Sequence, residues 1–515
     1  MSDHAPGSAK QRTIWTTLVA NSNWNFAAFG VVVMLNFFTL PIVVYRIGMP
    51  QFGIGGLVLA MLAPLMFVGV TIGQACVCEL APMLAERRIE AARQMFSSAL
   101  ALCLFACTIV LVAFGLGGSY LTQHLVGSDA DSQPYFRAVC LAATVGWIAQ
   151  QLLQIFQATI TSTQQFRALA ALNVVSAIAS SLCLLMATWV APTVLGFLSG
   201  TALGFIMTLL FTVQQSRRHA KVMFPLMRPK LGDIQRILAF CRWQAPAQIA
   251  GGLALQTDRY LLGGSASMSV VGQFNVATRL QEVVYMGVLK ISEVLFPHFS
   301  ASAEHPSEQA SVFLVSSWLI NTIAAVALAP LIALSSVVIT LWVDAGAAQF
   351  GAPMLRTLIT AGIIGSGMNV LTYFAMSRGY TRQLGIMALA HSIAVGVCST
   401  LLIFGFGPLA AGGGFLVANV LRLVWAIVIT PHIIGNRMPA SEVALSTLPP
   451  LAAGLFVGWF IDPVPATNWL AVFWNYALIG LTVFIASLAL SLVFAPPRTL
   501  MLKIYAGVYD NFTNR

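Results

Sequence analysis

The stretch "LPIVVYRIGMPQFGIGGLVLAMLAPL" (residues 40–65) is typical of the whole chain, because it holds a single charged residue, Arg46. Apolar runs of about 18 residues or more recur from end to end, and each is long enough to cross the hydrocarbon of a bilayer as a helix. Hydrophobic residues make up 58% of the 515 residues and charged residues 8%, and the mean hydropathy is +0.85. A soluble domain does not bury so much apolar surface. Since backbone polar groups in lipid must be paired internally, the sequence predicts an all-α integral membrane protein.

We predict about fourteen transmembrane helices, arranged as two six-helix lobes followed by two C-terminal helices. The predicted spans are roughly 25–45, 54–76, 97–117, 138–160, 168–190, 193–213, 240–257, 271–297, 311–333, 353–376, 385–405, 409–430, 443–461 and 469–494. The first 24 residues are polar and mixed, and the first apolar run is long enough to stay as an anchor, so no cleavable signal is expected.

The largest gap between spans is the stretch "QQSRRHAKVMFPLMRPKLGDIQRILA" (214–239), which is basic and contains proline. We interpret it as a cytoplasmic linker between an N-lobe (1–213) and a C-lobe (240–432), with the last two spans and a cytoplasmic tail in 433–515. Its basic residues also suit contact with anionic lipid headgroups.

The distribution of Lys and Arg predicts that both termini lie in the cytoplasm. Nineteen of the 26 cations then fall on the inner side: Lys10, Arg12, Arg87, Arg88, Arg93, Arg167, Arg217, Arg218, Lys221, Arg228, Lys230, Arg236, Arg242, Arg378, Arg382, Arg437, Arg498, Lys503 and Arg515. The outer side holds Arg46, Arg137, Arg259 and Arg356. The net charge of +10 therefore reflects membrane topology, and no nucleic-acid partner is needed to explain it.

The eighth predicted span carries four charges, Arg279, Glu282, Lys290 and Glu293. At about 100° per residue they share one helical face roughly 80° wide. Exposing that face to lipid would cost on the order of 10 kcal/mol, at roughly 2.5–3.5 kcal/mol per charge, so it must face protein or water. The spacing of three residues also lets Arg279 pair with Glu282, and Lys290 with Glu293.

Two interpretations of this charged face remain open: an ion-pair ladder between helices, and a water-accessible cavity with an excess of cations. Other spans favour the cavity, because they add polar residues that have no partner nearby in sequence. Arg422 lies well inside the twelfth span, with only Asn419 one turn earlier, and Asp258 and Arg259 end the seventh span at its outer edge.

A second polar face lies on the fourth span, where Trp147, Gln150, Gln154, Gln157 and Thr161 fall within about 80° of one another. Amides and an indole ring are what a sugar can hydrogen-bond to and stack on. Glutamines that hydrogen-bond neighbouring helices explain the pattern equally well.

The sequence predicts no metal site, no cofactor and no enzymatic activity. Cys76 and Cys78 have no His or carboxylate nearby at ligand spacing, and we interpret the cysteines as small apolar residues of helices. Asp129 and Asp131 lie in a short polar loop rather than in a catalytic domain. We interpret His391, which lies well inside a span, as a satisfied interior histidine rather than a titrating one.

Three stretches carry a family resemblance. They are residues 40–65, quoted above, "LQTDRYLLGGSASMSVVGQFNVATRLQEVV" (255–284) and "VLFPHFSASAEH" (294–305). They resemble the second helix, the Asp-Arg turn after the seventh helix and the Phe-Pro exit of the eighth helix in polysaccharide-type (O-antigen-type) flippases. These flippases form a branch of the multidrug/oligosaccharidyl-lipid/polysaccharide (MOP) exporter superfamily, and the length and the gap after the sixth span agree with it.

The resemblance implies a flippase of the bacterial inner (cytoplasmic) membrane. Such proteins carry undecaprenyl-pyrophosphate-linked oligosaccharides to the outer leaflet by alternating access, for surface polysaccharides such as lipopolysaccharide or exopolysaccharide. The implied partners are this polyprenyl-pyrophosphate-linked oligosaccharide, membrane lipids, a polysaccharide polymerase and a chain-length regulator.

A pyrophosphate group that crosses hydrocarbon needs cations, and arginine can hold phosphate through two hydrogen bonds. The expected pyrophosphate ligands are Arg279, Lys290, Arg422 and Arg259, of which Arg259 comes from the family turn. The expected charge partners, which would take up protons if transport is proton-coupled, are Glu282, Glu293 and Asp258. The expected sugar contacts are Trp147, Gln150, Gln154 and Gln157.

Three other functions compete with this prediction. A multidrug or cation antiporter of the related branch would use carboxylates inside its spans, yet the first six spans hold none, since Glu79 lies at a cytoplasmic edge. A peptidoglycan-precursor lipid flippase would need the same diphosphate chemistry with another saccharide. A glycan polymerase or ligase is disfavoured by the short outer loops.

Overall fold

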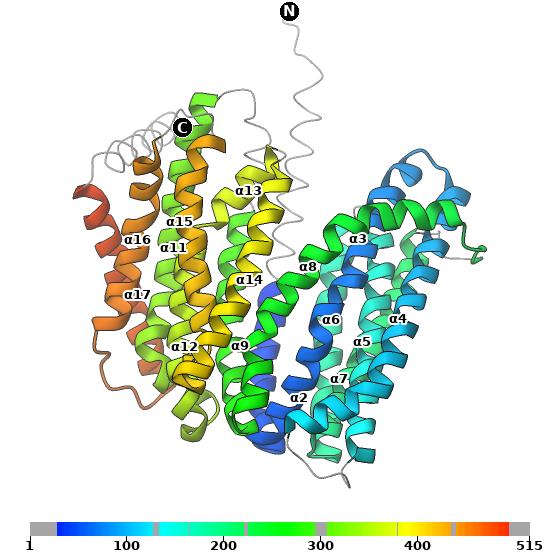
Figure 1. Cartoon of the computed structure of the whole chain (residues 1–515), viewed down its shortest axis with the longest axis horizontal. Coiled ribbons are helices and arrows are strands. Elements are labelled where there is room, and N and C mark those ends of the chain that lie inside the picture. Colours follow the sequence, from blue (N-terminus) through cyan, green and yellow to red (C-terminus); the bar gives the residue numbers. More distant parts are fainter. Residues whose placement is uncertain are drawn as a thin grey trace, which may run out of the picture. The chain divides into compact units, whose positions relative to one another are not determined.

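The computed structural model describes residues 28–126, 133–163, 165–220, 225–293, 306–378, 380–433 and 439–493. Within these ranges the chain is built from helices joined by short connections, without a β-strand (Figure 1). Twelve helices are long and apolar enough to cross a membrane. The chain is therefore a multi-pass, all-helical membrane protein, as the sequence predicts.

Contacts along the chain divide it into two compact units, Met1–Gly252 and Leu253–Arg515, which we call unit 1 and unit 2. The boundary falls inside helix α8 (Leu231–Ser265). Helix α7 (Val194–Ala220) occupies the start of the predicted linker, and α8 begins before that linker ends. The predicted domain bounds stay a prediction.

Unit 1 consists of helices and one short 3-10 turn. They are the helix Ala28–Ile47, α2 (Met49–Leu62), η1 (Ala63–Leu65), α3 (Met66–Ala85), α4 (Ile89–Val126), α5 (Gln133–Ser162), α6 (Phe166–Val190), α7 and the first part of α8. Helix α5 packs against α3, α4 and α7, and α7 also packs against α6.

The second predicted span is a broken helix, because α2 and α3 are separated by the 3-10 turn η1, which contains Pro64. Proline lacks a backbone N–H and crowds the preceding turn of a helix. Helix α5 compensates near the break, since Gln151 Oε1 accepts a hydrogen bond of 2.8 Å from the Gly69 N–H. A Cβ at Gly69 would lie 2.4 Å from that oxygen, so glycine makes the contact possible.

Small residues set the helix spacing in unit 1. A Cβ added to Gly204 on α7 would lie 2.7 Å from Ser180 Cα on α6, and one added to Gly146 on α5 would lie 3.1 Å from Ala202 Cα on α7. Lipid tails are as apolar as the helices, so no hydrophobic effect drives helices together within a membrane. Close backbone approach stabilises the helix pair through van der Waals packing instead.

We expect Gly204→Ala to destabilise unit 1, because the new methyl group meets the backbone of α6, which moves less easily than a side chain. The cost should be about 1–3 kcal/mol, as for other overpacked sites, and the thermal midpoint of the detergent-purified protein should fall by several degrees. Gly115→Ala on α4 is the matched control, since no atom lies within 4 Å of its added Cβ. Equal midpoints for the two variants would show that α6 and α7 are not packed this closely.

Unit 2 contains the end of α8 and the remaining described helices. They are α9 (Met268–Glu293), α11 (Pro306–Trp342), α12 (Ala345–Ser366), α13 (Asn369–Ser377), α14 (Thr381–Phe406), η3 (Pro408–Ala410), α15 (Gly413–Ile433), α16 (Ala440–Phe460) and α17 (Trp469–Val493). Helix α11 packs against α12, α16 and α17, while α12 packs against both α9 and α15 (Figure 1). Because α12 contacts both, it supports the two helices that carry most of the polar residues discussed below.

Twelve of the fourteen predicted spans correspond to helices that qualify by length and composition. The other two, 240–257 and 271–297, fall on α8 and α9, which are continuous helices of 35 and 26 residues. Their charged residues keep these two helices outside the apolar set. The count of fourteen and the orientation of the termini stay predictions.

Candidate substrate site

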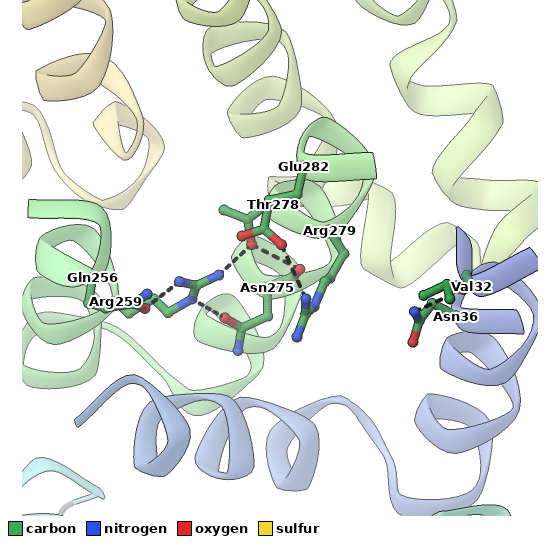
Figure 2. A network of polar contacts seen from close by, with 8 residues as sticks. All are labelled: Val32, Asn36, Gln256, Arg259, Asn275, Thr278, Arg279 and Glu282. Carbon is green, nitrogen blue, oxygen red and sulfur yellow. Dashed lines mark hydrogen bonds and ion pairs between the residues drawn. The ribbon is translucent and has the colours of Figure 1, made fainter. Parts of the chain in front are cut away.

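The first polar cluster of unit 2 surrounds Arg259, on the last turns of α8 (Figure 2). Its guanidinium donates to Asn275 Oδ1 at 2.6 Å, to Thr278 Oγ1 at 2.8 Å and to Gln256 Oε1. The side chain is only 9% exposed, and its guanidinium carbon lies 5.8 Å from the centre of the Phe274 ring. We call Gln256, Arg259, Asn275 and Thr278 the Arg259 cluster.

All three of these acceptors are neutral, and among the described residues no carboxylate lies within ion-pair distance of Arg259. Two carboxylates, Glu282 and Asp258, and the cation Arg279 lie within Coulombic reach of it. The three bonds use three of the five N–H groups of a guanidinium. Arg259 therefore ties α8 to α9 through neutral hydrogen bonds.

Arg279 lies one residue beyond Thr278 on α9 and has a different environment. Its Nη1 atom lies 3.2 Å from Glu282 Oε2, and the two side chains are 61% and 46% exposed (Figure 2). This confirms the ion pair predicted from the spacing of three residues. Because an exposed pair contributes little to stability, Arg279 can exchange Glu282 for another anion at small cost.

The rest of the charged face of α9 is less closely defined. Lys290 is partly buried near the end of α9, and Glu293 is its last residue. The Glu293 side chain lies outside the described part of the structure, so its pairing with Lys290 stays a prediction.

Asp258 contacts a helix end rather than a cation. Its Oδ2 atom accepts a hydrogen bond of 3.0 Å from the Gly412 N–H, just before α15 begins. Gly412 has a φ of +85°, a conformation that favours glycine. A carboxylate is stabilised at this end of a helix by the backbone dipoles. Asp258 thus anchors the start of α15, and no described Lys or Arg lies within ion-pair distance of it.

The second polar cluster of unit 2 surrounds Arg422 on α15. The Arg422 Nε atom is buried and has no hydrogen-bond partner. The residue lies within Coulombic reach of the Tyr285 hydroxyl on α9 and of the His391 ring on α14. The described residues supply no carboxylate for an ion pair with Arg422. Unlike the Arg259 cluster, which has two carboxylates within Coulombic reach, this cluster carries an uncompensated positive charge.

Two asparagines complete this second cluster. Tyr285 donates to Asn369 Oδ1 at 3.2 Å, where α13 begins. On α15, Asn419 donates from Nδ2 to the Ala361 carbonyl at 3.0 Å, and its Oδ1 lies 3.1 Å from His391 Nε2. We call Tyr285, Asn369, His391, Asn419 and Arg422 the Arg422 cluster.

Sequence reasoning missed Tyr285 and Asn369 as site residues. Tyr285 lies one turn beyond Glu282 on α9, at the edge of the charged face, which was a usable signal. Asn369 follows a short interruption between α12 and α13 at Gly367 and Met368. At such helix ends, side-chain amides often hydrogen-bond the backbone N–H and C=O groups that have no partner within the helix. Helix α9 is shared by both clusters, because it carries Asn275, Thr278 and Tyr285.

The polar face of α5 lies in unit 1. Trp147 is 4% exposed and its Nε1 atom has no hydrogen-bond partner, whereas Gln150, Gln154 and Gln157 are partly exposed. Among the neighbouring glutamines of α5, Gln151, which lies outside the predicted face, accepts a hydrogen bond from another helix. The role of the predicted sugar contacts stays a prediction.

The fold of the chain is similar to that of a solved lipid II flippase and of solved MOP transporters. It is similar to the lipid II flippase MurJ in an inward closed conformation, with a TM-score of 0.72, 12% identity, and coverage of 92% of this chain and 98% of that chain. An inward-facing multidrug resistance transporter of the MATE family is similar with a TM-score of 0.68 and 13% identity, over 81% of this chain and 100% of that chain. A third similar structure is a MOP transporter from Pyrococcus furiosus, whose binding pocket is described as having reverse polarity. Its TM-score is 0.54 and its identity 14%, over 79% of this chain and 96% of that chain.

The family is shown by the sequence itself. Residues 18–303, more than half of the chain, match the family described as "Polysaccharide biosynthesis protein", and the chain belongs to this family. No curated protein matches the chain. The predicted membership of the polysaccharide branch of the MOP superfamily is thereby confirmed, and the structural neighbours named above are transporters and a flippase.

Proposed function

We propose that this protein is a flippase that moves undecaprenyl-pyrophosphate-linked oligosaccharide units from the cytoplasmic to the outer leaflet of a bacterial inner membrane. In this proposal α8 and α9 complete a set of fourteen spans, and both termini lie in the cytoplasm. Transport proceeds by alternating access to the two sides of the membrane. The exported units then serve surface polysaccharide assembly, together with a polymerase and a chain-length regulator.

The observation that carries the proposal is the buried positive charge of Arg422 in unit 2, which pairs with no described carboxylate. Arg259 is buried against neutral acceptors, and the carboxylate that pairs with Arg279 is exposed. A structural ion-pair ladder would match each cation with an acid. A diphosphate, by contrast, carries several negative oxygens that guanidinium groups bind well.

We assign different roles to these arginines. Arg279 and Arg422, with Lys290, are the proposed ligands of the pyrophosphate. Arg259 holds α8 and α9 together, and its two remaining N–H groups can attract the anion electrostatically. On α5, a sugar would meet the exposed parts of Gln150, Gln154 and Gln157 before the buried Trp147.

A peptidoglycan-precursor lipid flippase is the second candidate, because the fold resembles a lipid II flippase over 92% of this chain. Both substrates share the polyprenyl diphosphate, so the arginines serve either equally. A cation exporter fits the residues less well. Its cargo would need a free buried carboxylate, and Asp258 offers only one oxygen, Oδ1, because its Oδ2 accepts from the Gly412 N–H.

Transport in proteoliposomes tests the proposal. We expect the purified protein to flip an undecaprenyl-pyrophosphate-linked oligosaccharide. The monophosphate-linked analogue should be flipped about tenfold more slowly, because the charge-assisted hydrogen bonds to the second phosphate are lost. A rhodamine cation should not be exported. Faster transport of lipid II would favour the second candidate, and export of the rhodamine without lipid transport would reject the flippase.

A further inference from the structure

The Arg422 cluster contains hydrogen-bond donors that have no acceptor. Asn369 is 6% exposed, and because its Oδ1 accepts from Tyr285, its amide nitrogen is the group left over. That Nδ2 atom is buried without a partner. A buried, unsatisfied amide costs about 1–3 kcal/mol, and a partner gained at some stage of the working cycle would offset that cost.

Arg422 supplies a second unfilled donor beside the same tyrosine. Its Nε atom is buried without an acceptor, and the residue lies within Coulombic reach of the Tyr285 hydroxyl. Donors from α13 and α15 therefore gather around one side chain of α9. Because both are donors and no described carboxylate pairs with Arg422, the missing partner is an acceptor that carries negative charge.

The orientation of His391 follows from its partner. Asn419 is 2% exposed and donates from Nδ2 to the Ala361 carbonyl, so its Oδ1 must be the acceptor toward His391. The His391 Nε2 atom then carries a hydrogen, and Nδ1 is the atom that can gain a proton. A proton there would lie within Coulombic reach of Arg422, and an anion close to both would offset the repulsion between the two positive charges.

The other charged or titratable groups near His391 are few. Helix α15 contributes Arg422, which in turn lies within Coulombic reach of Tyr285 on α9. Helix α13, which packs against α14, contributes Tyr373 and Arg378, both closer to the turn that joins α13 to α14. On α8, Ala254 packs with Val395 and Ala418 in an apolar cluster. One carboxylate, Asp258 on α8, also faces α14, but it does so at Ser399, about two turns along the helix from His391. Asp258 accepts from the Gly412 N–H and forms no ion pair with Arg422.

We propose that Tyr285, Asn369, His391 and Arg422 form an oxyanion site in unit 2 for a phosphoryl group, and that His391 Nδ1 takes up a proton when the anion binds. The inference rests on the proposed function only for the source of the anion, which is then the pyrophosphate of the lipid-linked substrate. No bond is made or broken in this step. The proton comes from solvent and returns there when the anion leaves.

Calorimetric titration of the full chain in detergent with inorganic pyrophosphate tests the site directly. Arg422→Gln should abolish binding, and Asn369→Leu should weaken it about tenfold or more, because one buried donor to a charged group is lost. Asn369→Asp keeps the acceptor for Tyr285 but places a negative charge at the site, and should also abolish binding. Arg382→Gln is the control, since this exposed arginine lies on α14 and outside the cluster.

The proton is tested through pH. Affinity for pyrophosphate should rise as the pH falls from about 8 to about 6, by at most about tenfold per pH unit for one proton. Pyrophosphate also takes up protons in this range, so His391→Gln, which can still donate to Asn419, supplies the baseline. The wild type should show the steeper slope, and heats in two buffers of different ionisation enthalpy should show proton uptake that the variant lacks.

Three results would overturn the inference: wild-type affinity in the Asn369 and Arg422 variants, equal slopes in wild type and His391→Gln, or chloride binding as tightly as pyrophosphate. The proposed function fails separately. Pyrophosphate binding without lipid transport would leave the site in place and reject the flippase. Lipid transport by a protein whose Asn369 and Arg422 variants bind pyrophosphate normally would reject the site alone.

Discussion

Replacing Arg422 by alanine is expected to abolish surface polysaccharide export while the protein stays in the membrane at wild-type abundance. The charge is buried and has no counter-ion in the described structure, so removing it relieves the fold and weakens only the binding of an anion. Loss of one charge-assisted pair with phosphate corresponds to about 1.5–3 kcal/mol, or at least a tenfold loss of transport. Arg422→Lys keeps the charge without the planar fork and should restore export in part. Glycan staining of cells and immunoblotting of membranes measure the two quantities.

Arg279→Ala is expected to give the same loss of export, because Arg279 is the exposed cation of α9 and its partner Glu282 releases it easily. Arg382→Ala, which removes an exposed charge from α14, should export normally and serves as the control. Normal export by both Arg279→Ala and Arg422→Ala would mean that the positive charge of unit 2 does not bind cargo.

Arg259→Met is expected to act on folding rather than on cargo. Methionine fills much of the same volume but leaves the acceptors of Gln256, Asn275 and Thr278 without their donor. Each buried group left unsatisfied costs about 1–3 kcal/mol, so the thermal midpoint in detergent should fall markedly.

The matched variant for this comparison is Arg279→Met, which alters an exposed side chain on the neighbouring helix. It should keep a wild-type midpoint and lose transport. If Arg259→Met kept the wild-type midpoint and lost transport, Arg259 would be a direct ligand of the diphosphate, as its place in the family turn first indicated.

The difference between these arginines could not be predicted from the sequence. Arg259, Arg279 and Arg422 all look like charges in or near apolar spans, and the sequence groups them as one cationic cavity. Which of them is satisfied by the protein depends on residues that arrive from other helices. Asn275 and Thr278 take up the donors of Arg259, whereas the Nε of Arg422 meets no acceptor.

The same limit applies to the polar face of α5. The sequence placed Trp147 and three glutamines on one face, and either sugar binding or helix contacts explained them. In the structure the helix contact is made by Gln151, which lies beside that face and reaches the Gly69 N–H. The glycine at position 69 decides this, because a Cβ there would lie 2.4 Å from the Gln151 oxygen and block the contact.

The sequence by itself determined the membrane class, the helical spans, the Arg279–Glu282 pair and the family. All of these follow from hydropathy, helical spacing or short motifs, and such signals are local along the chain. Only the tertiary structure decided that Asp258 anchors Gly412, 154 positions away, and that Tyr285 meets Asn369 across 84 positions. The physical reason is that a polar side chain in a membrane helix bonds to whichever group packing brings within about 3 Å, and packing depends on residues throughout the unit.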